Sequence, residues 1–149
     1  MSVGSVVVTG AGDGIGRAIA VRLAADGWNV VGLEIDRAAA EALGKTLGEG
    51  HRGLCGDASD RAVLKAAREA AEELAPLRGW VNNVGIALMG NLHEPVEADV
   101  ERLFSVNLMS HFWGSSEAIR TCVRDRVTGS IVNVSSVHGR SAFHMLAAY

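Results

Sequence analysis

A serine and a tyrosine in the last part of the sequence have the chemistry to move the proton of an alcohol. Ser136 ends an apolar segment, and Tyr149 lies 13 residues after it. A serine hydroxyl can polarise a carbonyl oxygen or hold an alcohol, and a tyrosine can exchange its proton. An unperturbed phenol has a pKa of about 10, so Tyr149 would need a cation nearby to act near neutral pH. No Gly-x-Ser-x-Gly elbow surrounds the Ser135-Ser136 pair, which argues against a hydrolase nucleophile.

An asparagine inside a long predicted helix is a further candidate. Asn is a poor helix former, and Asn107 lies between two apolar residues of the predicted helix 96–124. A buried amide needs partners, so Asn107 is either a satisfied core amide or a side chain that bends the helix and holds a water near a reaction centre. His138 and His144 have no acidic or thiol partner in their segment, so we expect no metal site there, although His138 could line a substrate pocket.

Residues 5–16, SVVVTGAGDGIG, combine a buried strand with a glycine-rich turn. Three valines predict a strand buried on both faces, and a helical pattern begins at Ile15. The glycines therefore lie at a helix N-terminus, where free backbone N–H groups, the helix dipole and missing Cβ atoms suit a pyrophosphate. A glycine-rich turn without a ligand is the alternative. The candidate cofactor-binding residues of this loop are Gly10, Asp13, Gly14, Ile15 and Gly16.

Charges after the second predicted strand favour NAD over NADP. Glu34 lies at the end of the predicted strand 28–35, where its carboxylate can accept both hydroxyls of an adenosine ribose and would repel a 2′-phosphate. Asp36 follows on the same side, Arg37 would favour a phosphate, and Asp13 adds negative charge. A solvated acid at a strand end is the alternative for Glu34. The balance of charges predicts NAD as the cofactor.

Polar residues after the next two strands add to the same predicted sheet edge. Asp57 can accept a hydrogen bond from the adenine amino group or cap the following helix, and both roles can coexist. Ala58 beside it is counted as a further cofactor contact. The run Asn82-Asn83-Val84-Gly85 either lets a cofactor approach the backbone or forms a structural network that braces the glycine loop. We take Asn83, Val84 and Gly85 as candidate cofactor contacts.

Strand and helix patterns alternate along the chain, which predicts an α/β fold with a parallel sheet covered by helices on both faces. The predicted strands are 6–8, 28–35, 53–56, 80–84 and 130–135. The predicted helices begin at 15, 38, 60 and 96, with Ser59 as the cap of the third. On the long fourth helix, Met109, Phe112 and Trp113 are expected in the core or in a subunit contact.

Composition and charge exclude several function classes. A chain of 149 residues predicts a single domain spanning 1–149. The net charge is −3 with scattered Lys and Arg, which gives no footprint for nucleic acid. No apolar run approaches the roughly 18–20 residues that span a bilayer, so no membrane partner is expected. Cys55 and Cys122 are isolated, which predicts reduced thiols and a cytoplasmic location.

Taken together, these residues resemble the short-chain dehydrogenase/reductase family over the whole chain. The family's Asn-Asn-Ala-Gly motif is matched by residues 82–85, with Val84 in place of alanine. Its glycine signature, Thr-Gly-x-x-x-Gly-Ile-Gly, is matched by Thr9, Gly10, Gly14, Ile15 and Gly16. The resemblance implies a Rossmann-type, doubly wound sheet with strand order 3-2-1-4-5. It also implies that the catalytic residues are Asn107, Ser136 and Tyr149.

The sequence departs from the family pattern at its last residue. The family signature continues Tyr-x-x-x-Lys, and this sequence stops at Tyr149. We therefore expect a fragment with little or no turnover, because the lysine that would make the tyrosine acidic and hold the nicotinamide ribose is missing. In the expected strand order, residues 131–134 form an unpaired apolar edge strand, which predicts instability, aggregation or pairing with another chain.

The resemblance implies an NAD-dependent oxidoreductase that interconverts a secondary alcohol and a ketone, on a small-molecule substrate whose identity the sequence leaves open. In the resembled mechanism Tyr149 exchanges the alcohol proton, Ser136 orients the substrate oxygen and Asn107 holds a relay water. A non-catalytic dinucleotide-binding or assembly module is the alternative. The long helix resembles one that the family uses in subunit contact, which implies a homo-oligomer.

Overall fold

The computed structural model describes residues 3–141 and 143–149 and contains a five-stranded sheet. The strands are β1 Ser5–Thr9, β2 Asn29–Glu34, β3 Arg52–Cys55, β4 Leu77–Asn82 and β5 Ser130–Asn133. They are hydrogen-bonded in the order β3-β2-β1-β4-β5, and the pairings are parallel. The α/β fold and the strand order predicted from the sequence are confirmed.

Helices cover both faces of this sheet. They are α1 Gly14–Ala25, α2 Arg37–Leu47, α3 Arg61–Leu74 and α5 Ser110–Asp125. A further helix, α4 Glu97–Phe104, lies beyond the sheet. One core cluster contains residues of α1 and α2, and the other contains residues of α3 and α5. Val6 and Val8 belong to the first cluster and Val7 to the second, because side chains alternate across a strand. The three valines thus place β1 at the centre of the fold.

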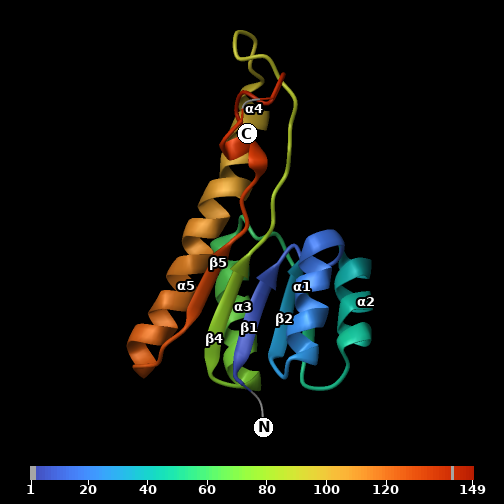
Figure 1. The fold of residues 1–149 in the computed structure, drawn as a ribbon, viewed down its shortest axis with the longest axis vertical. Helices are drawn as coiled ribbons and strands as arrows, with labels where there is room; N and C mark the ends of the chain where they lie inside the picture. Colours follow the sequence, from blue (N-terminus) through green and yellow to red (C-terminus); the bar gives the residue numbers. More distant parts are fainter. Residues whose placement is uncertain (1–2, 142) are drawn as a thin grey trace.

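The carboxyl ends of the strands meet at one edge of the sheet, where the segments that follow each strand begin (Figure 1). α4, the segment 83–96 and the C-terminal residues extend beyond this edge as a narrow projection. Within it, the Gly90 N–H donates to the Met145 carbonyl at 2.8 Å, and Gly90 forms an isolated bridge with Leu146. The two segments that follow β4 and β5 are therefore joined above the sheet.

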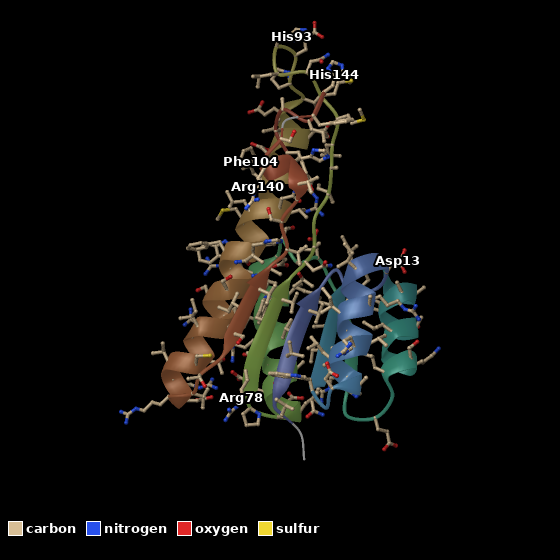
Figure 2. The ribbon with its side chains drawn as sticks, in the orientation of Figure 1. Asp13, Arg78, His93, Phe104, Arg140 and His144 are labelled. Atoms are coloured by element: carbon tan, nitrogen blue, oxygen red, sulfur yellow. The ribbon has the colours of Figure 1, made fainter. Side chains whose placement is uncertain are left out.

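Labelled side chains mark the two ends of the sheet (Figure 2). Asp13 lies at the carboxyl edge, and Arg78 lies at the opposite edge. His93 and His144 lie at the far end of the projection. The described residues contain no group of three or more His, Cys, Asp or Glu side chains that could hold a metal ion.

The long predicted helix is present, but it is not a regular α-helix. α4 runs into the π-helical turn η1 (Ser105–Met109), which runs directly into α5. Trp113 packs against the core. In contrast, Phe104, Met109 and Phe112 are exposed, so of the three residues expected in the core or in a subunit contact only Trp113 packs in the core.

Several predicted boundaries are wrong: β4 begins at Leu77 and not at residue 80, and β5 ends at Asn133 and not at residue 135. Two further differences have a local cause. The third long helix, α3, is capped by Asp60, whose carboxylate accepts from the Ala62 N–H at 2.8 Å, and not by Ser59. β4 ends at Asn82 and not at Val84. The reason is that the Asn83 and Val84 N–H groups bind the Thr9 hydroxyl, at 3.0 and 3.2 Å, and leave the strand ladder.

An ionic network joins α3 to α5. Arg68 is 7% exposed and contacts Glu72 of its own helix at 2.7 Å and Glu117 of α5 at 2.8 Å. Burial opposes ionisation of Glu72, but hydrogen bonds from Thr121, Arg124 and Arg68 outweigh it and lower the pKa of this carboxyl. The paired charges fix the two helices against each other beneath the sheet.

β5 lies at the edge of the described sheet, with Ile131 36% and Val132 51% exposed.

Cys55 and Cys122 are both free thiols. Within residues 3–141 and 143–149, no helix combines the length and the apolar character required to cross a membrane.

Candidate functional site

The glycine loop between β1 and α1 has the backbone geometry that requires glycine. Gly10 and Gly14 have φ values of +64° and +54°, in the left-handed region. A Cβ on Gly16 would collide with the Gly10 carbonyl. The loop therefore folds tightly onto the start of α1.

Asn83 holds this loop from the neighbouring strand end. Its Nδ2 donates to the Thr9 and Gly10 carbonyls at 3.1 and 3.2 Å. Of the two interpretations of the Asn-Asn segment, a brace for the glycine loop thus describes what Asn83 does. Val84 and Gly85 continue from it along the carboxyl edge.

The first turn of α1 has the features of an anion site. Asp13 is the N-cap residue, and its exposed side chain makes no capping hydrogen bond. Space is open beside Gly14, where a Cβ would meet nothing within 4 Å. Backbone N–H groups of a first helical turn bind phosphate oxygens when no side chain caps them. The residues present therefore fit a dinucleotide's pyrophosphate.

Glu34 is held beside the loop by three backbone groups. Its carboxylate accepts from the N–H groups of Gly12, Ile35 and Asp36, at 2.9, 2.9 and 3.2 Å. A Cβ on Gly12 would lie 2.5 Å from the Glu34 Cγ, so only glycine allows this approach. Asp36 instead caps α2 through the Ala39 N–H at 2.7 Å. The structure places Glu34, and not Asp36, against the loop.

Asp57 follows β3 and is bound by Ser59 and by Arg102 of α4. Its carboxylate accepts from the Ser59 N–H at 2.8 Å and hydroxyl at 2.7 Å, and pairs with Arg102 Nη2 at 2.9 Å. Burial would raise the pKa of Asp57, but the hydrogen bonds from Ser59 and Arg102 outweigh it and lower this pKa. The neighbouring Ala58 is buried. Sequence reasoning missed Arg102, because nothing in a helical Arg–Leu pair points to a loop more than forty residues away.

Asn107 lies in the π-helical turn η1, and both ends of its side-chain amide bind the backbone of the same residue. Its Oδ1 accepts from the Ile86 N–H, and its Nδ2 donates to the Ile86 carbonyl, both at 2.8 Å. It is thus a satisfied amide at an irregular helix turn, which combines parts of both interpretations. π turns of this kind occur frequently at functional sites.

An open cavity of about 840 Å³ lies between the strand ends and the helix η1–α5. It brings together seven of the sequence-predicted site residues: Ile15, Asn83, Val84, Gly85, Asn107, Ser136 and Tyr149. Gly10, Asp13, Gly14, Gly16, Glu34, Asp57 and Ala58 lie outside its lining. The three residues with predicted catalytic roles therefore share one space with the end of β4.

Ser136 and Tyr149 present their hydroxyl groups differently. The Ser136 Oγ accepts from the His138 N–H at 3.2 Å at the start of the short 3-10 helix η2 (Val137–Gly139), so its own proton remains available to an acceptor. Tyr149 is 42% exposed, and its ring centroid lies 6.3 Å from that of His138. His138 therefore contacts the Tyr149 ring but is not among the residues that line the cavity, although the sequence suggested that it could line a substrate pocket.

Among the lining residues that the sequence reasoning missed are a histidine and a serine of α5. His111 Nε2 lies 2.9 Å from the Val84 carbonyl, and the Ser115 hydroxyl accepts from Asn82 at 3.0 Å. Both line the cavity with Asn107. Their spacing from Asn107, four and eight residues, places all three on one helix side and could have revealed them.

Comparison with known proteins gives a consistent result. A family model for short chain dehydrogenase matches residues 4–149. L-2,3-butanediol dehydrogenase of Corynebacterium glutamicum is 36% identical, and the match covers 96% of this chain. 2-(S)-Hydroxypropyl-CoM dehydrogenase 3 of Xanthobacter autotrophicus is 35% identical over 97% of the chain. A protein from the same organism named inactive 2-(S)-hydroxypropyl-CoM dehydrogenase 2 is 36% identical over 83% of the chain.

These matches cover only part of each relative: 58% of the first two and 54% of the third. The chain thus spans a little over half the length of the curated relatives it matches. Within that span, the family model, the sequence identity, the glycine loop and the strand order agree. The chain therefore belongs to the short-chain dehydrogenase family.

Proposed function

We propose that this chain is the cofactor-binding and catalytic part of an NAD-dependent oxidoreductase that interconverts a secondary alcohol and a ketone. The observation that carries the proposal is the shared cavity, in which Asn107, Ser136 and Tyr149 lie beside residues 83–85. Two of the relatives are named as dehydrogenases of a butanediol and of a hydroxypropyl compound. These names support a small hydroxyl-bearing substrate.

The cofactor would lie along the carboxyl edge of the sheet. The glycine loop would hold the pyrophosphate, Glu34 the adenosine ribose, and Asp57 with Ala58 the adenine. The Glu34 carboxylate is fixed by three N–H groups, so it cannot easily turn away from a 2′-phosphate. This rigid negative charge favours NAD over NADP.

The chemistry would take place at the other end of the cofactor. When bound, the nicotinamide ring supplies the hydride donor or acceptor. Ser136 would donate its hydroxyl proton to the substrate oxygen and hold it in place. Tyr149 would take the alcohol proton during oxidation and return it during reduction. In the family pattern a lysine four residues after the tyrosine supplies the cation for this step. Asn107 would stabilise the π-helical turn η1 beside the reacting groups by binding the Ile86 backbone.

Titration of the chain with NADH, followed by NADH fluorescence, tests the cofactor assignment. Gly14→Val should abolish measurable binding, because the valine fills the open space at the first turn of α1. Gly48→Val is the matched control. Gly48 also has a positive φ, +80°, and open space for a Cβ, but it lies after α2. The control carries the same kind of backbone strain without touching the loop.

The two variants should differ in their binding of NADH. We expect the wild type and Gly48→Val to bind NADH with similar affinity and Gly14→Val not to bind. Equal binding by all three proteins would refute the glycine loop as the cofactor site. Tighter binding of NADPH than of NADH would refute the role of Glu34.

A second candidate is a dinucleotide-binding module without catalysis. It is favoured by the 36% identity to a relative whose name describes it as inactive. A panel of secondary alcohols with NAD distinguishes the two. Turnover that disappears in Tyr149→Phe supports the oxidoreductase. NADH binding without turnover supports the module only when it is measured on a chain that continues to a lysine four residues after Tyr149, because little turnover is expected without that lysine.

We also infer that the protein forms a homo-oligomer through the long helix. Large apolar side chains spaced by four and seven residues are exposed along one side of it: Phe104, Leu108, Phe112, Ile119 and Val123. A contiguous apolar stripe on a helix surface is typical of a protein contact.

A further inference from the structure

Three side chains at the carboxyl edge form a closed triangle of hydrogen bonds. Arg102 donates through Nη1 to the Ser59 hydroxyl at 2.8 Å and through Nη2 to Asp57 Oδ2 at 2.9 Å. Ser59 donates its hydroxyl and N–H to Asp57 Oδ1, at 2.7 and 2.8 Å. The Ser59 hydroxyl has one proton, which goes to Asp57, so its lone pair is left for Arg102. The Ser59 hydroxyl therefore donates to Asp57 and accepts from Arg102 at the same time.

The triangle links two parts of the chain that are distant in sequence. Asp57 and Ser59 belong to the loop between β3 and α3, and Arg102 belongs to α4. α4 continues without a break into η1, where Asn107 is bound to Ile86. The last turn of α4 is thus attached to the loop beside β3, and the η1 turn that follows it is attached to the segment after β4.

The triangle also fixes the state and the direction of the Asp57 carboxylate. The hydrogen bonds from Ser59 and Arg102 favour its ionised form, so it can only accept. Each oxygen has a partner on a different side, Ser59 for Oδ1 and Arg102 for Oδ2, so rotation about the terminal bond is blocked. The lone pairs that remain are therefore held in a fixed direction.

We propose that Arg102 is a positioning residue for recognition of the adenine amino group, acting through Asp57. This inference rests on the proposed binding of NAD. With Arg102 in place, the carboxylate presents a preorganised acceptor to the amino group. Without it, Oδ2 loses its partner, the carboxylate turns, and the acceptor is no longer in place when the adenine arrives. A simple tether between α4 and the loop would instead affect all ligands of the site equally.

The test compares two dinucleotides that differ only at the adenine amino group. NADH carries the amino group, and its deamino analogue carries a carbonyl oxygen there. The wild type, Arg102→Gln, Arg102→Lys and the control Arg120→Gln are titrated with both. Arg120 is 63% exposed on α5, so the control removes the same charge outside the triangle. Circular dichroism and the thermal midpoint report the folding of each variant.

We expect the wild type and Arg120→Gln to bind NADH about fivefold more tightly than the analogue, which is the size expected for one hydrogen bond. Arg102→Gln should lose this preference by weaker NADH binding, with the affinity for the analogue unchanged. Arg102→Lys keeps one N–H donor for Asp57 and should be intermediate. If Arg102→Gln does not fold, Arg102→Lys carries the same comparison.

Three results would overturn the inference. The first is an undiminished preference for NADH in a folded Arg102 variant. The second is an equal loss of affinity for both dinucleotides, which identifies a tether. The third is a wild type that binds NADH and the deamino analogue with equal affinity, since Asp57 then does not recognise the amino group. A wild type that binds neither would refute the proposed function itself, and the inference with it.

Discussion

Asn82 is the residue on which three elements converge at the sheet's carboxyl end. Its Oδ1 accepts from the Trp80 indole at 2.8 Å, and its Nδ2 donates to Asn133 Oδ1 at 2.8 Å and to the His111 carbonyl at 3.1 Å. The side chain is fully buried. It therefore joins β4, β5 and α5 through a single amide whose two ends cannot be exchanged.

Asn82→Asp replaces the donor end of this amide with an oxygen that faces acceptors. We expect a loss of about 3 kcal/mol in the free energy of unfolding, because a charge is then buried without its partners. Urea denaturation followed by tryptophan fluorescence measures it. Asn91→Asp in the exposed segment 83–96 is the control and should change stability by less than about 0.5 kcal/mol. Coincident denaturation curves for Asn82→Asp and the wild type would contradict this role.

At this scale the sequence allowed the residue types to be predicted, but not their partners. Asn82 and Asn83 are adjacent and identical, and a structural network was one interpretation of both. The structure shows that they face opposite ways, since Asn83 binds the Thr9 and Gly10 carbonyls and Asn82 binds α5 and β5. The two side chains point in opposite directions because β4 ends between Asn82 and Asn83. The strand ends there because the Asn83 N–H binds the Thr9 hydroxyl, a contact that no local sequence pattern reveals.

Among the elements, strand β2 has one of its first N–H groups bound by a histidine side chain and not by the neighbouring strand. β3 begins opposite Val31, so the Val30 N–H has no partner in the β3 ladder. His51 Nδ1 accepts from this N–H at 3.1 Å. Burial lowers the pKa of His51 below its usual 6.5, because the partly buried ring disfavours the charge. Protonation of Nδ1 would remove the acceptor.

The stability of the protein should therefore fall in mild acid. Because the pKa of His51 is lower in the folded than in the unfolded chain, its contribution is complete above pH 6.5 and is lost as the pH falls through the folded value. His51→Asn supplies an acceptor that does not titrate, so its unfolding free energy should decline less between about pH 7.5 and 5. His93→Asn, on a side chain that is 77% exposed, should decline like the wild type. Parallel curves for His51→Asn and the wild type would contradict the prediction.

The long helix shows which part of an element periodicity can predict. Its existence and approximate ends follow from the sequence, since α4 and α5 occupy nearly all of 96–124. An irregularity at Asn107 was one interpretation of the sequence, but the partner of this amide, Ile86, lies 21 residues earlier and is not revealed by the helical pattern. Past the π turn the buried positions are Ser110, Gly114, Ala118 and Thr121, which are small or polar residues that an apolar pattern overlooks.

For the whole molecule, the alternating elements predicted a parallel sheet with helices on both faces, and the resemblance to the family implied the doubly wound topology and its strand order. The oligomeric state depends on surfaces, and the exposed stripe on α4–α5 became apparent only in the structure. A cytoplasmic location and a single domain stay predictions of the sequence.

The exposed stripe gives a prediction for the assembled protein. Ile119→Glu combined with Val123→Glu places two charges on side chains that are 52% and 73% exposed. We expect the wild type to be an oligomer and the double variant to be a smaller species with unchanged helicity, since charges in an apolar contact repel. Light scattering after size exclusion measures the mass. Val21→Glu on α1 is the control and should keep the wild-type mass; a monomeric wild type would contradict the prediction.

The π turn at Ser105–Met109 also constrains the number of residues in this part of the chain. A π turn closes its hydrogen bonds one residue later than an α-helix does, so the two halves of the long helix are out of phase by one position, about 100° of rotation. Deleting one residue there would restore a regular α-helix without rotating α5, so Gly114, where a Cβ would lie 2.6 Å from Trp80 Nε1, would still face β4. Inserting one more residue would instead turn α5 by about 100° and place a bulkier neighbour against β4. This segment should therefore tolerate the loss of one residue better than the gain of one.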